Sequence, residues 1–208
     1  ILITHEHSDH IKGLENLLKR TPLPVYAPEL VAAALRLQLS EASCVRPIPA
    51  EEDLTLGALN IIPFPTSHDT AQSVGYRLSS DDGCTVVIAT DTGCVTEKML
   101  DYMSGADIAL LEANHDVARL KNGPYPPALK RRILSDRGHL SNDECLWLAS
   151  VLAHRGTKHI VLGHLSRQNN LPGLALRTVG RGLEGTNAEL TAAPELGCLE
   201  VEVTPCFV

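Results

Sequence analysis

The chain has 208 residues, of which 44% are hydrophobic, and we expect one domain with a sizeable core over residues 1–208. No run in the sequence approaches the ~18 apolar residues that span a bilayer, which argues against a membrane protein. The formal net charge of −7 argues against nucleic-acid binding over the whole surface. Six scattered cysteines without a Cys-x-x-Cys pair indicate reduced thiols in a cytoplasmic protein: Cys44, Cys84, Cys94, Cys145, Cys198 and Cys206.

Apolar strand-like runs alternate along the chain with amphipathic helical patterns, which favours an α/β (α+β) fold. The predicted strands lie near 1–3, 24–27, 59–65, 74–79, 85–90, 107–112, 158–162 and 197–203. The predicted helices lie near 10–20, 28–40, 95–103, 116–122, 127–134, 141–153 and 172–182. No segment resembles an interdomain linker.

The first apolar run leads directly into four side chains that bind metals well: His5, His7, Asp9 and His10. Alternate side chains of an extended segment point the same way, so the first three can face one side. Imidazole and carboxylate groups suit a borderline divalent ion. The alternative is a polar turn with histidines placed by chance, which this spacing makes a poor explanation. The motif therefore predicts the metal site of a hydrolase.

Three more polar residues each follow an apolar run that reads as a strand. His68 follows residues 59–65, Asp91 follows 85–90 and His164 follows 158–162. Taken singly, a histidine in such a place is more often structural than a ligand. Together they reinforce one another, since strand ends carry chemistry on a rigid scaffold.

The His-x-His-x-Asp-His string resembles the signature of the metallo-β-lactamase superfamily, and the later residues follow in that family's order. The resemblance implies a four-layer αββα sandwich with two divalent ions, manganese or zinc, at one edge. It assigns His5, His7 and His68 to one ion, Asp9, His10 and His164 to the other, and Asp91 to a bridge between them. The chain opens without Met, inside the strand that carries the motif, so we expect the N-terminal strands of this fold to be missing.

Residues 111–116, 125–142 and 163–170 are similar to the YycJ (WalJ) group of that superfamily. Members of this group are assigned as 5′-to-3′ exonucleases acting on DNA, so the resemblance implies a DNA-digesting phosphodiesterase. One alternative is another hydrolase of the superfamily, such as a thioesterase or lactamase, because activity belongs to the site and not to the fold. A second alternative is an inactive fragment that binds only DNA or metal.

The segment from Arg119 to Arg137 holds six basic residues and one acidic residue, a local charge of +5. Its place between two motif segments favours phosphate contacts by Lys130, Arg131 and Arg132, with a solvated helix face as the alternative. His115 is added to the substrate-binding set by its position alone. Aromatic residues make up only 3% of the chain, so recognition of the nucleic-acid backbone is more natural than extensive base stacking.

Glu112 and His139 lie in strings that resemble ribonuclease Z, where a Glu–His pair serves the leaving group. We expect His139 to be the general acid and Glu112 to orient it and stabilise its charged form. Asp9 completes the predicted catalytic set. The alternative for His139 is a purely structural role at the start of the helix predicted over 141–153.

Overall fold

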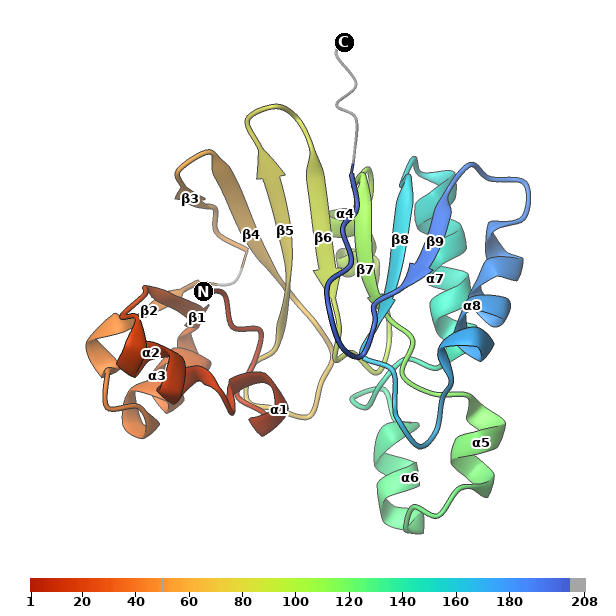
Figure 1. Cartoon of the computed structure of the whole chain (residues 1–208), viewed down its shortest axis with the longest axis horizontal. Coiled ribbons are helices and arrows are strands. Elements are labelled where there is room, and N and C mark those ends of the chain that lie inside the picture. The colour runs from red at the N-terminus through yellow and green to blue at the C-terminus, as the bar shows by residue number, and fades with distance from the viewer. Residues whose placement is uncertain (50, 203–208) are drawn as a thin grey trace.

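The computed structural model describes residues 1–49 and 51–202, and its larger sheet has seven strands. In spatial order these are β3 (Leu54–Leu56), β4 (Leu59–Pro65), β5 (Val74–Ser80), β6 (Thr85–Ala89), β7 (Ile108–Glu112), β8 (His159–Gly163) and β9 (Glu189–Ala192). Neighbouring strands are antiparallel from β3 to β6 and parallel from β6 to β9. The carboxyl ends of β4, β6, β7 and β8 therefore lie at one edge of the sheet (Figure 1).

A smaller sheet consists of the parallel strands β1 (Val25–Pro28) and β2 (Val45–Ile48). The helix α3 (Glu29–Gln38) and a short 3-10 turn (Ala42–Cys44) connect them. Ahead of β1 lie two short helices, α1 (Ser8–Ile11) and α2 (Leu14–Arg20). The first residues of the chain run beside β1, with a single bridge between Leu2 and Tyr26.

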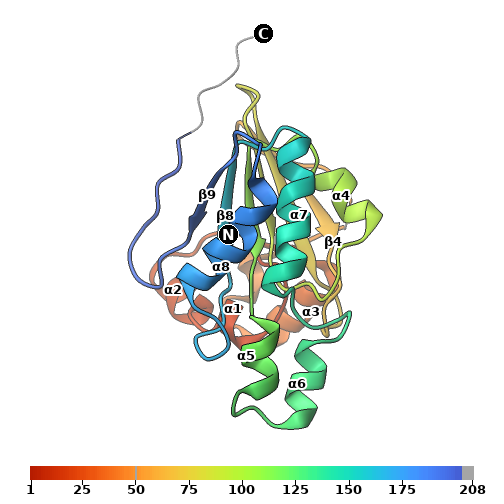
Figure 2. The same cartoon turned by 90° about the vertical axis from the view of Figure 1, so that its right-hand side faces the viewer.

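Three helices pack against the large sheet: α4 (Glu97–Met103), α7 (Asn142–His154) and α8 (Pro172–Gly180). A 3-10 turn (Arg181–Leu183) continues α8. A reciprocal capping box between Ser141 and Glu144 starts α7. The helices α5 (Val117–Asn122) and α6 (Pro127–Ile133) form a hairpin that projects beyond the sheet edge where the parallel strands end (Figures 1 and 2).

Three buried clusters show how the layers are stacked. One joins α4, α7 and α8 to the large sheet through residues such as Met103, Leu111 and Leu148. A second lies between the sheets and includes Tyr26 and Tyr76. A third joins the small sheet to α2 and α3. The order helix, sheet, sheet, helix is the predicted αββα arrangement, with two strands in the smaller sheet.

Several elements differ from the prediction, because whether a short segment forms a strand depends on the segment with which it pairs. The strand expected at 1–3 forms only the bridge at Leu2, and the helix expected over 10–20 is divided at Gly13. Neither β2 nor β3 was predicted. The strand β2 contains Pro47, which is tolerated because it pairs only with β1. The last strand is β9, not 197–203; residues 197–202 form no strand, and residue 203 lies outside the described residues.

The described residues contain no helix that is long and apolar enough to cross a membrane. Their five cysteines are free thiols: Cys145 is buried, Cys198 is exposed, and the other three are partly buried. Cys206 lies outside the described residues. The expectation of free thiols therefore agrees with the part of the chain that the structure describes.

The buried hydroxyl of Tyr76 ties the N-terminal segment to the large sheet by donating a 2.7 Å hydrogen bond to the carbonyl of Ile3. We expect Tyr76→Phe to lower the free energy of unfolding by about 1–3 kcal/mol, because the carbonyl loses this donor in a buried place. Urea denaturation measures the change. The matched control is Tyr102→Phe, whose hydroxyl lies 3.5 Å from Glu51 at the surface, and which should cost less than about 0.5 kcal/mol. Equal losses from both variants would contradict this role.

Candidate active site

Residues from five separate segments meet at the edge where β4, β6, β7 and β8 end. The N-terminal motif turns into α1 just after His7. His68 follows β4, and Asp91 follows β6. Glu112 is the last residue of β7, and His164 comes directly after β8. The large sheet thus collects side chains that are far apart in the sequence.

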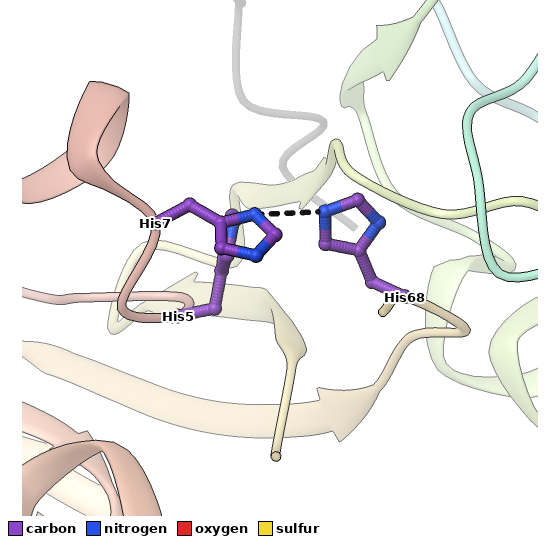
Figure 3. Close-up of side chains that lie close together, drawn as sticks. All are labelled: His5, His7 and His68. Atoms are coloured by element: carbon purple, nitrogen blue, oxygen red, sulfur yellow. Dashed lines mark hydrogen bonds between the residues drawn. The ribbon is translucent and has the colours of Figure 1, made fainter. Parts of the chain in front are cut away.

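His5, His7 and His68 form the first group of ring nitrogens. Figure 3 shows His7 and His68 facing each other with His5 beside His7, and His7 Nδ1 lies 3.2 Å from His68 Nε2. One nitrogen of each ring lies within 4.8 Å of the others. The second ring nitrogen of His68 lies 3.0 Å from the carbonyl of Gly138, to which it can donate. A hydrogen bond of this kind holds a metal-binding histidine in orientation.

Asp9, His10 and His164 form a second group, also with donor atoms within 4.8 Å of one another. Asp91 lies between the groups: its carboxylate oxygens are 3.3 Å from His10 Nε2, 3.4 Å from His164 Nε2 and 3.9 Å from His68 Nε2. Burial by itself would raise the pKa of Asp91, but the neighbouring histidines hold it well below its usual range. The carboxylate is therefore charged and can serve both groups.

Two of these residues have an unusual backbone. Asp91 has φ 57° and His164 has φ 53°, both in the left-handed region that non-glycine residues seldom adopt. Such conformations persist only where the surrounding structure enforces them, and they gather at functional sites. Here they turn both side chains toward the same point at the sheet edge.

The state of His5 fits a metal ligand. Its side chain is fully buried, and its Nε2 has no hydrogen-bond partner. Burial lowers the pKa of His5 to about 4 against the opposing charge of Asp91, so the ring is neutral near pH 7. A neutral buried imidazole with an unpaired nitrogen is costly unless a metal ion takes the lone pair. The residues present therefore fit divalent metal ions.

The carboxylate of Glu112 is fully buried and accepts four hydrogen bonds. Its Oε1 lies 2.8 Å from Nδ1 of His139 and 2.7 Å from Nδ1 of His164. Its Oε2 accepts from the backbone N–H groups of Thr92 and Leu140 at 3.1 and 3.3 Å. Burial would raise the pKa of Glu112, yet the hydrogen bonds from the two histidines lower it below its ordinary value.

His164 has the complementary shift. Burial alone would lower its pKa, but the hydrogen bond to Glu112 and the charges of Asp91 and Asp9 raise it to about 9. With Nδ1 bound to Glu112, the Nε2 of His164 is the nitrogen that faces Asp91. Sequence reasoning linked Glu112 to His139 alone and missed this second imidazole.

The loop that carries His139 packs tightly against the loop that follows Asp91. A Cβ atom on Gly93 would come within 2.3 Å of the backbone nitrogen of Gly138, so a larger residue would force the loops apart. This contact leaves His139 Nδ1 3.9 Å from Asp91. The donor atoms of His139, Asp91, Glu112 and His164 also lie within 4.8 Å of one another. Because Nδ1 of His139 is engaged by Glu112 at 2.8 Å, we keep His139 apart from the two ligand groups above.

Asp69 is a site residue that the sequence analysis passed over. Its Oδ1 lies 3.6 Å from His68 Nε2 and 3.9 Å from His7 Nε2. Its other oxygen is hydrogen-bonded by the guanidinium of Arg132 on α6. The position directly after His68 was the one signal in the sequence that could have identified it.

A cleft of about 500 Å³ opens over these groups. It is lined by His7, Asp9, Asp69, Asp91, Asn114, Tyr125, Leu129, Arg132, Ile133, Gly138, His139, His164, Leu165, Ser166, Arg167 and Gln168. Among the predicted substrate-binding residues, only Arg132 lines it. Lys130 donates to the carbonyl of Lys121, and Arg131 is exposed outside it. His115 is buried, with 1% of its surface exposed, beside Ser141.

A family model described as the Beta-lactamase superfamily domain matches residues 1–165. The exodeoxyribonuclease YycJ of Bacillus anthracis is 40% identical over 193 residues, which cover 88% of this chain and 70% of the relative. The exodeoxyribonuclease WalJ of Streptococcus pneumoniae is 41% identical over 184 residues, which cover 86% and 68%.

Among solved structures, the metallo-beta-lactamase fold protein YhfI from Bacillus subtilis superposes with a TM-score of 0.70. It is 19% identical, and the match covers 92% of this chain and 73% of that protein. At this identity the likeness supports the fold alone. Together with the family match and the relatives above, it shows that the chain belongs to the beta-lactamase superfamily, as a metal-dependent hydrolase of the metallo-β-lactamase fold.

Proposed function

We propose that the protein is a two-metal phosphodiesterase that digests DNA from its 5′ end. The observation that carries the proposal is the hydrogen bond between the buried Glu112 and His139, because His139 lines the cleft beside the candidate metal ligands. Hydrolysis of a phosphodiester needs a proton for the leaving alkoxide, and a histidine held by a buried carboxylate is suited to supply it. The similarity to two exodeoxyribonucleases over most of both chains supports DNA as the substrate.

The ligand groups divide the site between two ions. His5, His7 and His68 would hold one, Asp9, His10 and His164 would hold the other, and Asp91 would contact both. A His/Asp site without cysteine accepts manganese or zinc. Ions held by these residues would supply positive charge for the scissile phosphate and would lower the pKa of a water molecule toward ~7.

The protein's own groups would handle the leaving oxygen. Glu112 holds Nδ1 of His139, which leaves Nε2 as the nitrogen that can give a proton to the substrate. The same hydrogen bond fixes the orientation of the ring at the cleft. Arg132 lines the same cleft and would contact a non-bridging phosphate oxygen. Asp9, whose side chain is 66% exposed, lies at the open side of the site, where substrate and water enter.

A nuclease assay tests the function directly. Duplex DNA labelled at its 5′ or 3′ ends is incubated with the protein after chelation and again after adding back manganese or zinc. We expect metal-dependent release of mononucleotides from 5′-phosphorylated ends. Matched RNA, a chromogenic lactam and a thioester are the competing substrates. Faster turnover of any of these would overturn the proposal.

Asp91→Ala is expected to lose metal and activity together, because the carboxylate contacts members of both ligand groups. Elemental analysis of the purified variant measures the metal content. Circular dichroism is the control for folding. Two ions still bound per folded chain would contradict the bridging role.

His139→Ala is expected to keep both ions, since His139 lies outside the proposed ligand sets. Cleavage should slow by ~10²–10⁴-fold if the residue is the general acid. The loss should shrink on a p-nitrophenyl phosphodiester, whose leaving group departs without a proton. Glu112→Gln should slow cleavage as well and should in addition weaken metal binding, because the carboxylate also holds the proposed ligand His164. An equal loss on both substrates would mean that His139 has a structural or metal-binding role.

Arg132→Ala is expected to weaken DNA binding and to reduce the slope of log affinity against log salt by about 1, because one phosphate contact is lost. Metal content should not change. The matched control is the neighbouring Arg131→Ala, which removes the same charge outside the cleft and should have the smaller effect. Equal effects would place the path of the DNA backbone along the outer face of α6.

A further inference from the structure

The wall of the cleft formed by the α5–α6 hairpin is largely apolar. Leu129 and Ile133 lie one helical turn apart on α6, and both line the cleft. Tyr125, in the loop just before α6, continues the same wall and is half-buried. The lining from Leu165 to Gln168 carries three polar side chains. The hairpin therefore supplies apolar surface to a cleft whose lining also includes polar groups.

Tyr125 is presented on a stiff loop. Pro124 and Pro126 flank it, and a residue that precedes proline is restricted to extended conformations. Gly123 anchors the start of the loop, since a Cβ atom there would come within 2.9 Å of the side-chain oxygen of Asn169 and 2.8 Å of the carbonyl of Arg119. A loop held in this way loses little backbone freedom when a ligand covers the ring.

The other aromatic residues of the described chain are used elsewhere. Phe64 is buried and stacks on Tyr102, with ring centroids 5.7 Å apart. Tyr26 and Tyr76 are buried between the two sheets. Trp147 is exposed on α7, outside the cleft. Within the described residues, Tyr125 is thus the only Phe, Trp or Tyr side chain that lines the cleft.

We infer that Tyr125 stacks on the base of the 5′-terminal nucleotide while the phosphate of that nucleotide lies over the metal ligands, and this rests on the proposed function. An aromatic ring can stack on any of the four bases, so the contact holds the end of the strand without reading its sequence. Leu129 and Ile133 extend the apolar surface beside the ring, and Arg132 lies on the same helix for the phosphate. The low aromatic content argues against stacking on many bases. Stacking on a single terminal base requires only one aromatic ring.

The outer face of the terminal base is open at a duplex end and at a single-stranded end alike, so the ring can stack on either. The contact positions the substrate and takes no part in proton transfer. Its loss should appear mainly in KM.

The test compares the wild-type protein with Tyr125→Ala and Tyr125→Phe on 5′-phosphorylated oligonucleotides. One substrate has a normal 5′-terminal nucleotide, one has an abasic terminal nucleotide, and one has the abasic position ten nucleotides away. We expect the terminal abasic site to raise the wild-type KM about tenfold or more, and Tyr125→Ala to raise it by a similar factor on normal DNA. The alanine variant should then be indifferent to the terminal base. Tyr125→Phe should behave as wild type, because it retains the ring.

Trp147→Ala is the matched control, since it removes an exposed aromatic ring outside the cleft, and it should retain the wild-type preference for a terminal base. If Tyr125→Ala and the terminal abasic site raise KM independently, so that their effects multiply, the inference is overturned. It is also overturned if the KM of the wild-type protein does not depend on the terminal base. Either outcome leaves the nuclease proposal standing. A wild-type protein that releases no nucleotide from any of the three substrates would overturn the proposed function itself.

Discussion

The buried carboxylate of Glu112 is the interaction on which the rest of the site depends. A buried charge is costly unless it is fully hydrogen-bonded, and here two imidazoles and two backbone N–H groups satisfy it. The imidazoles come from residues 27 and 52 positions along the chain. One of them is a candidate metal ligand and the other a candidate proton donor. Glu112 therefore couples the orientation of the proposed metal site to that of the proposed acid.

This coupling is built by strand register. Glu112, the last residue of β7, pairs with Gly163, the last residue of β8. The residue that follows β8, His164, therefore lies beside the carboxylate of Glu112. The parallel pairing of β6 with β7 brings the turn at Asp91 to the same edge. The N-terminal motif reaches this edge by a different route, through the bridge at Leu2 and the hydrogen bond from Tyr76 to Ile3. A register shift in any of these strands would separate the ligand groups.

The α5–α6 hairpin connects the proposed substrate contacts to the candidate metal ligands. Arg132 donates a hydrogen bond to the carboxylate of Asp69, and this carboxylate lies next to His7 and His68. Through Tyr125, the same hairpin supplies the apolar part of the cleft. A chain with a net charge of −7 can in this way present a basic, partly aromatic surface at one place. In the proposed function, a phosphate would compete with Asp69 for Arg132, since both are anions.

The sequence by itself determined the chemistry that is local in the chain. Histidines and aspartates at the ends of apolar runs identified the candidate ligands, and the long runs at 85–90, 107–112 and 158–162 identified the central strands, because burial on both faces demands continuous apolar residues. Periodicity also located α4, α7 and α8. The link between Glu112 and His139 was expected from resemblance, and the structure places the two groups in hydrogen-bond contact.

Only the tertiary structure decided what depends on distant partners. The short strands β2, β3 and β9 lack a pattern of their own and exist because a neighbour pairs with them. The same reason explains the second imidazole on Glu112, the ion pair of Asp69 with Arg132, and the burial of His115, which its position had suggested for the substrate. Of the three adjacent basic residues on α6, helix rotation alone selects Arg132 for the cleft. Residue type and spacing specify which groups are available, whereas sheet register and helix packing determine which of them meet.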